Sequence, residues 1–246
     1  MAITQERLHV SSDSSARVEA VETIVTALRN GLIFDAKDTM YPSTLDGYVE
    51  TSSVNVESKC YGSPISTCYG LVIEGSASLK LNSGETFSLP LHHYFSIPDT
   101  FEISGMAKVS IIERFGYRGT FMLGGPLEQS GRLCYIDGCS DTLLISPHRL
   151  GDPCLNLLTF PRQTKQTFHL HPSVRLGTVV WGEGRCVTAG GSIPLTKGQV
   201  FYLPERLQHC FHTDDQELAV VAYHPDSDWG PTDAAHPMIN RTYINR

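Results

Sequence analysis

Three histidines in the second half of the chain have the spacing of a metal site. His169 and His171 are separated by one residue, and His209 follows after a later apolar stretch. Residues two apart in an extended strand point to the same face, so the first two imidazoles should converge, and a neighbouring strand could bring the third alongside. Three neutral nitrogens suit Fe(II), Zn(II), Cu(II), Ni(II) or Mn(II) and leave positions open for substrate and oxygen.

The elements that must carry these histidines are predicted to be almost entirely strands. Short stretches of Val, Ile, Leu, Phe and Tyr are interrupted about every ten residues by turns that contain Gly or Pro, which is typical of a β-sandwich or barrel. One helix is expected over residues 15–30, where Val18, Val21, Val25 and Leu28 recur at helical spacing. We therefore expect an all-β fold with a short N-terminal helix.

The chain contains an internal repeat. Gly75 and Ile97-Pro98 reappear as Gly182 and Leu203-Pro204, displaced by nearly the same number of residues. Three further landmarks recur in the same order: Asp38-Thr39 with Asp141-Thr142, Gly125-Pro126 with Gly230-Pro231, and Tyr135-Ile136 with Tyr243-Ile244. The repeat predicts two copies of one β unit, at residues 36–138 and 139–246, after an N-terminal arm at residues 1–35.

The sequence around the three histidines resembles the two motifs of the cupin superfamily. The matching positions are His169 and His171 with the closing Gly182 in the first motif, and Gly198, Pro204 and His209 in the second. This resemblance implies a bicupin, that is, two tandem jelly-roll β-barrels, with the metal ligands in the C-terminal barrel.

Three residues depart from the cupin motifs. Arg175 stands where the family usually has a glutamate ligand, Arg206 replaces a turn glycine, and Thr213 replaces an asparagine. Because the carboxylate ligand is missing, the resemblance implies a three-histidine site, as in the dioxygenase branches of the superfamily that act on thiols, gentisate-like compounds and diketones.

The first copy lacks the equivalent ligands. The corresponding positions are Gly62, Pro64, Cys68 and Ile103, none of which is an imidazole or a carboxylate. We therefore expect one metal ion per chain, held by the second copy.

Arg175 carries most of the information about the substrate. A guanidinium beside a divalent cation is strongly repelled, so either it turns into solvent or an anionic group bridges it to the metal. Its planar fork suits a carboxylate, and we expect the bridging arrangement, with a small anionic substrate.

The expected chemistry is that of a non-haem Fe(II) dioxygenase in which Tyr202 or His212 assists proton transfer if the fold brings either within reach. By strand parity, His212 should face away from His209. Two alternatives remain: Lewis-acid chemistry without oxygen, in an isomerase, lyase or decarboxylase, and a non-catalytic cupin that binds a small molecule.

The other candidate positions are expected to be structural. Gln166 or Thr167, Trp181 and Phe211 should point inward as core filling. The remaining histidines that we considered are read as structural or as part of a packed terminal arm, namely His92, His93, His224 and His236.

The composition excludes several classes of partner. The 246 residues include 19 Lys and Arg against 26 Asp and Glu, a net charge of −7 that does not favour nucleic acid. The N-terminal sequence lacks the apolar core of a signal peptide, and the longest apolar run, residues 218–223, is too short for a membrane span. Seven cysteines without a C-x-x-C pair suit a reducing compartment, so we expect a cytoplasmic protein, as a monomer or homodimer.

Overall fold

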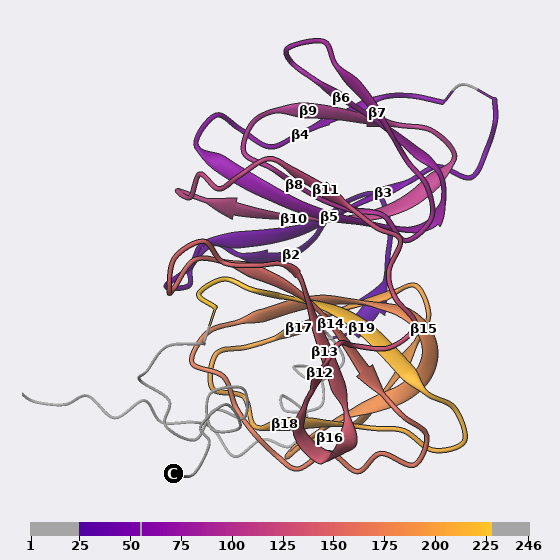
Figure 1. Cartoon of the computed structure of the whole chain (residues 1–246), viewed down its shortest axis with the longest axis vertical. Helices are drawn as coiled ribbons and strands as arrows, with labels where there is room; N and C mark the ends of the chain where they lie inside the picture. The colour runs from indigo at the N-terminus through magenta and orange to yellow at the C-terminus, as the bar shows by residue number, and fades with distance from the viewer. Residues whose placement is uncertain (1–24, 55, 228–246) are drawn as a thin grey trace, which may run out of the picture.

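The computed structural model describes residues 25–54 and 56–227, which form antiparallel strands and one 3₁₀ turn (Figure 1). The strands of the first half are β1 (Val25–Ala27), β2 (Gly31–Ala36), β3 (Ser43–Val49), β4 (Lys59–Tyr61), β5 (Ser66–Gly75), β6 (Ala77–Leu81), β7 (Thr86–Leu89), β8 (Tyr94–Ile97), β9 (Phe101–Ser104), β10 (Ala107–Phe115) and β11 (Met122–Gly124). Those that follow are β12 (Leu133–Cys134), β13 (Ser140–Ile145), β14 (Cys154–Phe160), β15 (Arg175–Thr188), β16 (Gly191–Thr196), β17 (Gln199–Leu203), β18 (His209–His212) and β19 (Leu218–His224), with the 3₁₀ turn η1 (Ile136–Gly138) before β13. The all-β prediction is confirmed.

The helix expected over residues 15–30 is wrong where the structure describes it. Val25–Ala27 is strand β1, which pairs antiparallel with β17, and the N–H of Leu28 donates to the carbonyl of Gly198 at 3.1 Å. The branched side chains of Val25 and Thr26 suit a strand, and pairing with the edge of β17 outweighs the helical spacing. The rest of the predicted helix lies outside the described residues. Among those that are described, no helix is long and apolar enough to cross a bilayer.

The same strand order occurs twice along the chain. In the first sheet the order is β11-β8-β5-β10-β3-β2, and in the second it is β1-β17-β15-β19-β14-β13-β12. In both sheets a long strand pairs with a later, shorter strand on one side and with the last long strand of its half on the other. In the first half β5 lies between β8 and β10, and in the second β15 lies between β17 and β19. The outer sheet β4-β9-β6-β7 closes over the first half, and β16 and β18 pair with the far end of β15. Figure 1 shows the two halves one above the other.

Pairs of residues inside the sheets repeat as well. Gly70 lies opposite Phe95 between β5 and β8, and Gly177 lies opposite Phe201 between β15 and β17. In each pair the phenyl ring covers the glycine and occupies the space that a Cβ would need. The predicted equivalence of Gly75 and Gly182 is reflected in their φ angles of +71° and +73°.

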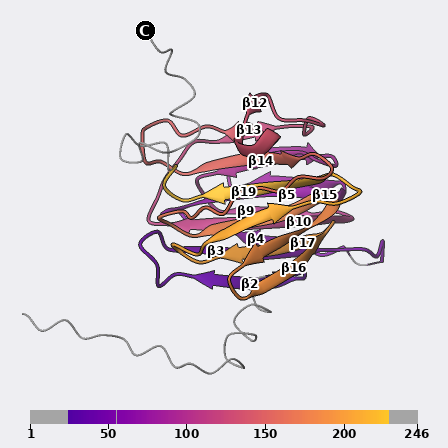
Figure 2. The ribbon, with the colours of Figure 1, turned by 90° about the horizontal axis from the view of Figure 1, so that it is seen from below.

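Alternating residues divide the core into three parts. One apolar cluster fills each half, and a third lies between the two sheets and joins them. On β19, Leu218, Val220 and Ala222 point into the C-terminal half, whereas Val221 and Tyr223 point into the shared cluster. In Figure 2, β15 and β19 lie over β5 and β10, the strands with which they share this core. A residue's parity on these strands therefore decides whether it faces the interior of its own half or the other half.

The glycine–phenylalanine pair gives a stability prediction that does not involve the metal site. Gly70→Ala should lower the free energy of unfolding by about 1–3 kcal/mol, because the added methyl group overlaps the ring of Phe95. The cost should shrink in a Phe95→Leu background, where the ring is gone. Urea denaturation of the two single variants and the double variant measures this coupling, and strictly additive costs would contradict the overlap.

Candidate metal centre

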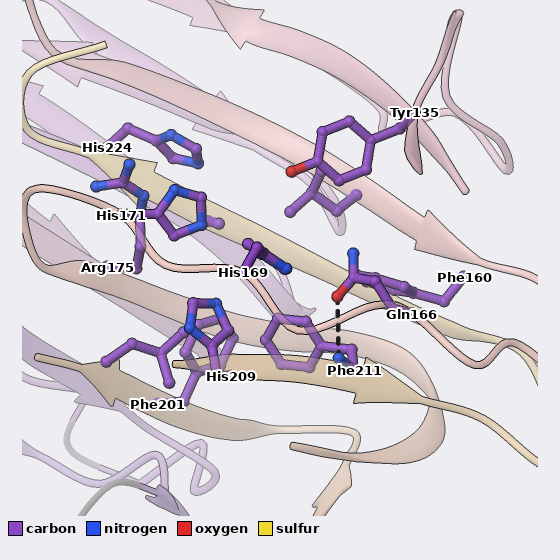
Figure 3. A pocket seen from close by; sticks show the side chains of 13 residues that line it. Tyr135, Phe160, Gln166, His169, His171, Arg175, Phe201, His209, Phe211 and His224 are labelled. Atoms are coloured by element: carbon purple, nitrogen blue, oxygen red, sulfur yellow. Dashed lines mark hydrogen bonds between the residues drawn. The ribbon is translucent and has the colours of Figure 1, made fainter. Parts of the chain in front are cut away.

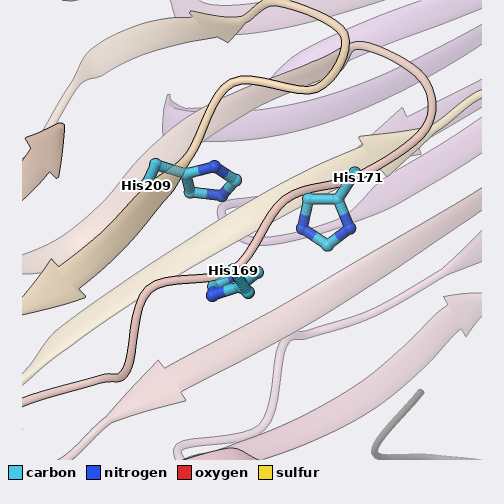
Figure 4. A group of neighbouring side chains, drawn as sticks. All are labelled: His169, His171 and His209. Atoms are coloured by element: carbon cyan, nitrogen blue, oxygen red, sulfur yellow. The ribbon is translucent and has the colours of Figure 1, made fainter. Parts of the chain in front are cut away.

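The backbone brings the three predicted histidines together. His169 and His209 form an isolated antiparallel bridge in which each N–H donates to the other's carbonyl at 3.0 Å. The N–H of Arg206 donates to the carbonyl of His171 at 2.8 Å, and this bond ties His171 to the loop that precedes His209. The ring centroids lie 4.6 Å apart for His169 and His209, 5.0 Å for His169 and His171, and 5.3 Å for His171 and His209 (Figure 4).

The three imidazoles could hold one metal ion. One ligand nitrogen from each ring lies within 4.8 Å of the others, and this is the only such group of three His, Cys, Asp or Glu side chains in residues 25–54 and 56–227. Nitrogens bound to one ion at about 2.1 Å lie about 3–4 Å apart, so small rotations of the rings suffice.

The tautomers of two rings are set by the backbone. Nδ1 of His169 lies 3.1 Å from the carbonyl oxygen of Thr167, and Nδ1 of His209 lies 2.9 Å from that of Leu207. A carbonyl oxygen can only accept, so in both rings Nδ1 carries the proton and Nε2 presents a lone pair. Such a hydrogen bond on the far nitrogen is typical of histidine metal ligands.

Burial keeps His209 neutral. Desolvation, with smaller contributions from His169 and Arg175, lowers the pKa of His209 from 6.5 to about 3. The imidazole is therefore uncharged near neutral pH, which is the form that binds a metal ion.

A small pocket surrounds the three rings (Figure 3). Its volume is about 20 Å³, slightly more than one water molecule needs. Six apolar side chains form one wall: Leu158, Phe160, Phe201, Leu203, Phe211 and Ala222. The polar side chains are Tyr135, Gln166, Arg175, His224 and the three histidines, and among the described residues that line the pocket none is acidic.

Arg175 lines this pocket and does not turn into solvent. Its side chain is 3% exposed, and Nη1 donates to the hydroxyl of Ser173 at 2.7 Å, to the carbonyl of Ser173 at 3.1 Å and to the carbonyl of Val174 at 2.9 Å. The same nitrogen lies 3.9 Å from Oδ1 of Asp226. These contacts fix the guanidinium beside the histidines and exclude the solvent-facing alternative.

Two predicted catalytic residues do not reach the pocket. Tyr202 lies between Phe201 and Leu203 on β17, so its ring points the other way, into the core shared by the two halves, and packs on Phe34 at 5.9 Å. His212 also faces away, as strand parity predicted; its Nε2 lies 3.2 Å from the carbonyl of Gln166 and 3.3 Å from Sγ of Cys210. Neither Tyr202 nor His212 is among the described residues that line the pocket, so the fold does not meet the condition on which their suggested roles in proton transfer depended.

The structure adds two residues that sequence reasoning missed. His224 is the last residue of β19, where the Pro225 that follows it suggested a loop, and its ring lies 5.9 Å from that of His171. His224 lies two residues after Ala222 on the same strand, so the two side chains share a face, and this spacing could have predicted that His224 faces the pocket. Tyr135 enters the pocket from the segment before η1, and no spacing in the sequence indicated this.

Of the positions expected to face inward, Gln166 and Phe211 do line the pocket. Trp181 instead packs on His92 in the core between the halves, with ring centroids 5.8 Å apart. Thr167 binds the carboxylate of Asp137 through its N–H and its hydroxyl. The structural reading of His92 therefore fits its place in the shared core.

Comparisons with known proteins agree with this geometry. Residues 156–224, which contain all three histidines, match the family model described as Cupin domain. A solved cupin 2 conserved barrel domain protein from Leptotrichia buccalis superposes with a TM-score of 0.57 at 14% identity, over 81% of this chain and 88% of that one. The chain has a cupin fold.

Two enzymes share this cupin fold. Oxalate decarboxylase from Bacillus subtilis, described with Mn(II) centres, gives a TM-score of 0.53 at 12% identity over 84% of this chain and 78% of its own. Salicylate 1,2-dioxygenase from Pseudaminobacter salicylatoxidans gives 0.54 at 11% identity, over 75% and 71%. No curated protein sequence matches the chain. The histidine cluster, in a fold shared with metal-dependent enzymes, supports a metal ion at this place.

Two of the residues that depart from the cupin motifs have defined structural roles in this chain. Arg206, in place of a turn glycine, has φ of +59°, a conformation that glycine adopts without strain. Thr213, in place of asparagine, is fully buried; its hydroxyl accepts from the N–H of Thr164 and donates to the carbonyl of Pro161. Of the corresponding positions in the first half, Cys68 and Ile103 are buried in its apolar cluster.

The histidine cluster predicts the metal content of the protein. Protein purified without added metal should contain about one metal ion per chain, and a His169→Ala/His209→Ala double variant should contain almost none, because three ligands are the minimum for such a site. His212→Ala is the matched control and should retain the metal, since His212 points away from the cluster. Elemental analysis decides this, and equal metal content in the wild type and the double variant would contradict the site.

The lowered pKa of His209 predicts how acid affects the metal-free protein. The unfolded chain takes up a proton on this residue below pH 6.5, but the folded chain does so only near pH 3. The contribution of His209 to the free energy of unfolding is therefore fully present above pH 6.5. It falls by about 2 kcal/mol between pH 7 and pH 4.5. Urea denaturation at the two pH values, with chelator present, should show this loss in the wild type and in the exposed-site control His148→Gln, and a smaller loss in His209→Gln.

Proposed function

We propose that the protein is a metal-dependent cupin enzyme in which His169, His171 and His209 hold Fe(II) and Arg175 anchors a small carboxylic acid that is oxidised by O₂. The observation that carries the proposal is that a buried guanidinium and three imidazoles line one pocket to which no described acidic residue contributes. An oxygenase of this kind needs both an anion site and open metal positions.

The charge balance of the pocket favours an anionic ligand. Neutral imidazoles do not offset the two charges of a metal ion, and Arg175 adds a third. Asp226 lies 3.9 Å from Nη1 of Arg175 and is not among the described residues that line the pocket. A carboxylate between Arg175 and the metal would bring negative charge to both, and the planar guanidinium would orient it.

The size and the walls of the pocket limit the substrate further. A cavity of about 20 Å³ holds little more than one water molecule, so any substrate requires the pocket to open, and a short acid requires the least opening. The apolar wall around Phe160, Phe201 and Phe211 keeps water out, and exclusion of water strengthens the interaction between Arg175 and its ligand. When bound, Fe(II) would supply one-electron chemistry with oxygen, which the side chains of this pocket do not provide.

The alternative is a decarboxylase or isomerase that uses the same residues without oxygen. Its support is the shared fold with oxalate decarboxylase, a protein named for reaction at a small carboxylic acid. In that case Arg175 would hold the acid in the same place, while the metal would act as a Lewis acid.

We also propose that residues 36–138 and 139–246 are two cupin copies, a bicupin with one metal ion per chain, preceded by the arm at residues 1–35. The repeated strand order and the repeated glycine–phenylalanine pairs support this division. The arm contributes β1 to the sheet of the second copy, so it is not an independent unit.

Oxygen uptake tests the proposal. Protein loaded with Fe(II) should consume O₂ in the presence of a short carboxylic acid, and Arg175→Gln should lower kcat/KM at least about a hundredfold, as expected for the loss of a charged hydrogen-bonded anchor. Arg162→Gln, at an exposed arginine, is the matched control and should behave as wild type. Metal content and circular dichroism should be checked in both variants, since Arg175 is also bonded to Ser173.

The same assay separates the alternatives. Consumption of an acid without O₂ uptake would favour the decarboxylase or isomerase. Tight binding of acids with no turnover under either condition would favour a non-catalytic binding protein, and unchanged kinetics in Arg175→Gln would rule out its role as the anchor.

A further inference from the structure

Gln166 is a buried polar residue of the pocket to which the proposed function gives no role. Its side chain is 3% exposed and lines the same pocket as Arg175 and the three histidines. Oε1 accepts a hydrogen bond from the backbone N–H of Phe211 at 2.9 Å, shown as the dashed line in Figure 3.

This hydrogen bond fixes the orientation of the carboxamide. A backbone N–H can only donate, so the atom facing Phe211 must be the oxygen, and the NH₂ group is directed elsewhere. Among the residues that the structure describes, none accepts a hydrogen bond from Nε2 of Gln166. Because Gln166 lines the pocket, this NH₂ group is available to donate to a ligand there.

The position of Gln166 makes it a second contact for a substrate. In Figure 3 it lies on the far side of His169 from Arg175. The Phe211 ring beside it lies 5.8 Å from the ring of His209 and 5.2 Å from that of Phe160, so the carboxamide stands where the histidine cluster meets the apolar wall. Because Oε1 is already bonded and amide nitrogens are poor ligands, Gln166 does not belong to the metal site itself.

We propose that Gln166 is a specificity-determining residue whose NH₂ group donates to an oxygen at the far end of the substrate. This inference rests on the proposed function, in which Arg175 anchors one carboxylate. The substrate is then a short acid with a second oxygen acceptor, of which a dicarboxylate is the simplest, and not a plain fatty acid.

Binding of malonate and propionate to protein loaded with Co(II) tests this inference. The two acids have the same number of carbons, but only malonate has an acceptor at its far end. Calorimetry and the visible absorption of Co(II) report binding without turnover. We expect wild-type protein to bind malonate at least about tenfold more tightly than propionate, the effect of one hydrogen bond to a charged acceptor.

Two variants separate the donor from the structural bond. Gln166→Glu keeps an oxygen for the N–H of Phe211 but replaces the donor with a negative charge, and Gln166→Met removes both groups at similar size. Both should lose the preference for malonate, with Co(II) content unchanged. Gln199→Glu is the matched control, because Oε1 of Gln199 accepts from the N–H of Thr196 at 2.7 Å away from the pocket.

The outcomes distinguish this inference from the proposed function. If both Gln166 variants still prefer malonate, the preference comes from the metal alone and the inference is overturned. A wild-type protein without a preference for malonate would also overturn it. So would loss of Co(II) from Gln166→Glu. If Arg175→Gln nevertheless loses affinity for both acids, the anion site stands. If Arg175→Gln binds both acids as tightly as the wild type does, or if the wild type binds neither acid, both the inference and the proposed function fail.

Discussion

The reciprocal backbone hydrogen bonds between His169 and His209 are the constraint on which the site depends. Residues directly opposite each other in an antiparallel bridge have side chains on the same face, so this one pairing aligns two rings. The third ring follows from spacing within the chain, because His171 lies two residues beyond His169, and its carbonyl is held by the N–H of Arg206. The segment that carries the two histidines is otherwise irregular, with Phe168 and Leu170 exposed on its outer side. A few backbone bonds, and not a regular sheet, thus set the geometry of the cluster.

The division of the core explains which residues can take part in chemistry. Each long strand of the second half has one face toward the pocket and the other toward the first half. On β17, Phe201 and Leu203 face the pocket, while Tyr202 joins the cluster between the halves. Contacts such as that between Tyr69 and Tyr223, at 5.2 Å, and the hydrogen bond from Thr178 to Ser110, at 2.9 Å, tie the pocket-forming strands to the other half. The first half therefore packs against the face of these strands that is turned away from the pocket, and its own interior is filled with apolar side chains.

Much of this arrangement could be predicted from the sequence, and the failures share one physical cause. The H-x-H spacing, the later histidine and the repeat are local or periodic patterns, which is why the fold class and the convergence of the three rings could be anticipated. The alternation of side chains along a strand could also be predicted. It shows that Tyr202 and Phe201 face opposite ways, but not which of them faces the pocket. That choice is made by the packing of the two halves. Likewise Val25–Ala27 had a helical period, and only its long-range pairing with β17 makes it a strand.

The replacement of an acidic ligand by Arg175 changes the electrostatics of the site more than its shape. Arg206 has a positive φ, as a turn glycine would, and Arg175 brings a positive charge to the pocket where the cupin motif usually has a negative one. Ser173, Val174 and Asp226 contact the guanidinium and fix its position in the pocket without any ligand. A site whose own groups supply positive charge and hydrogen-bond donors but, among the described residues, no negative charge is complementary to an anion. In the function that we propose, selectivity depends on what the anion bound to Arg175 carries at its other end, near Gln166 and the apolar wall.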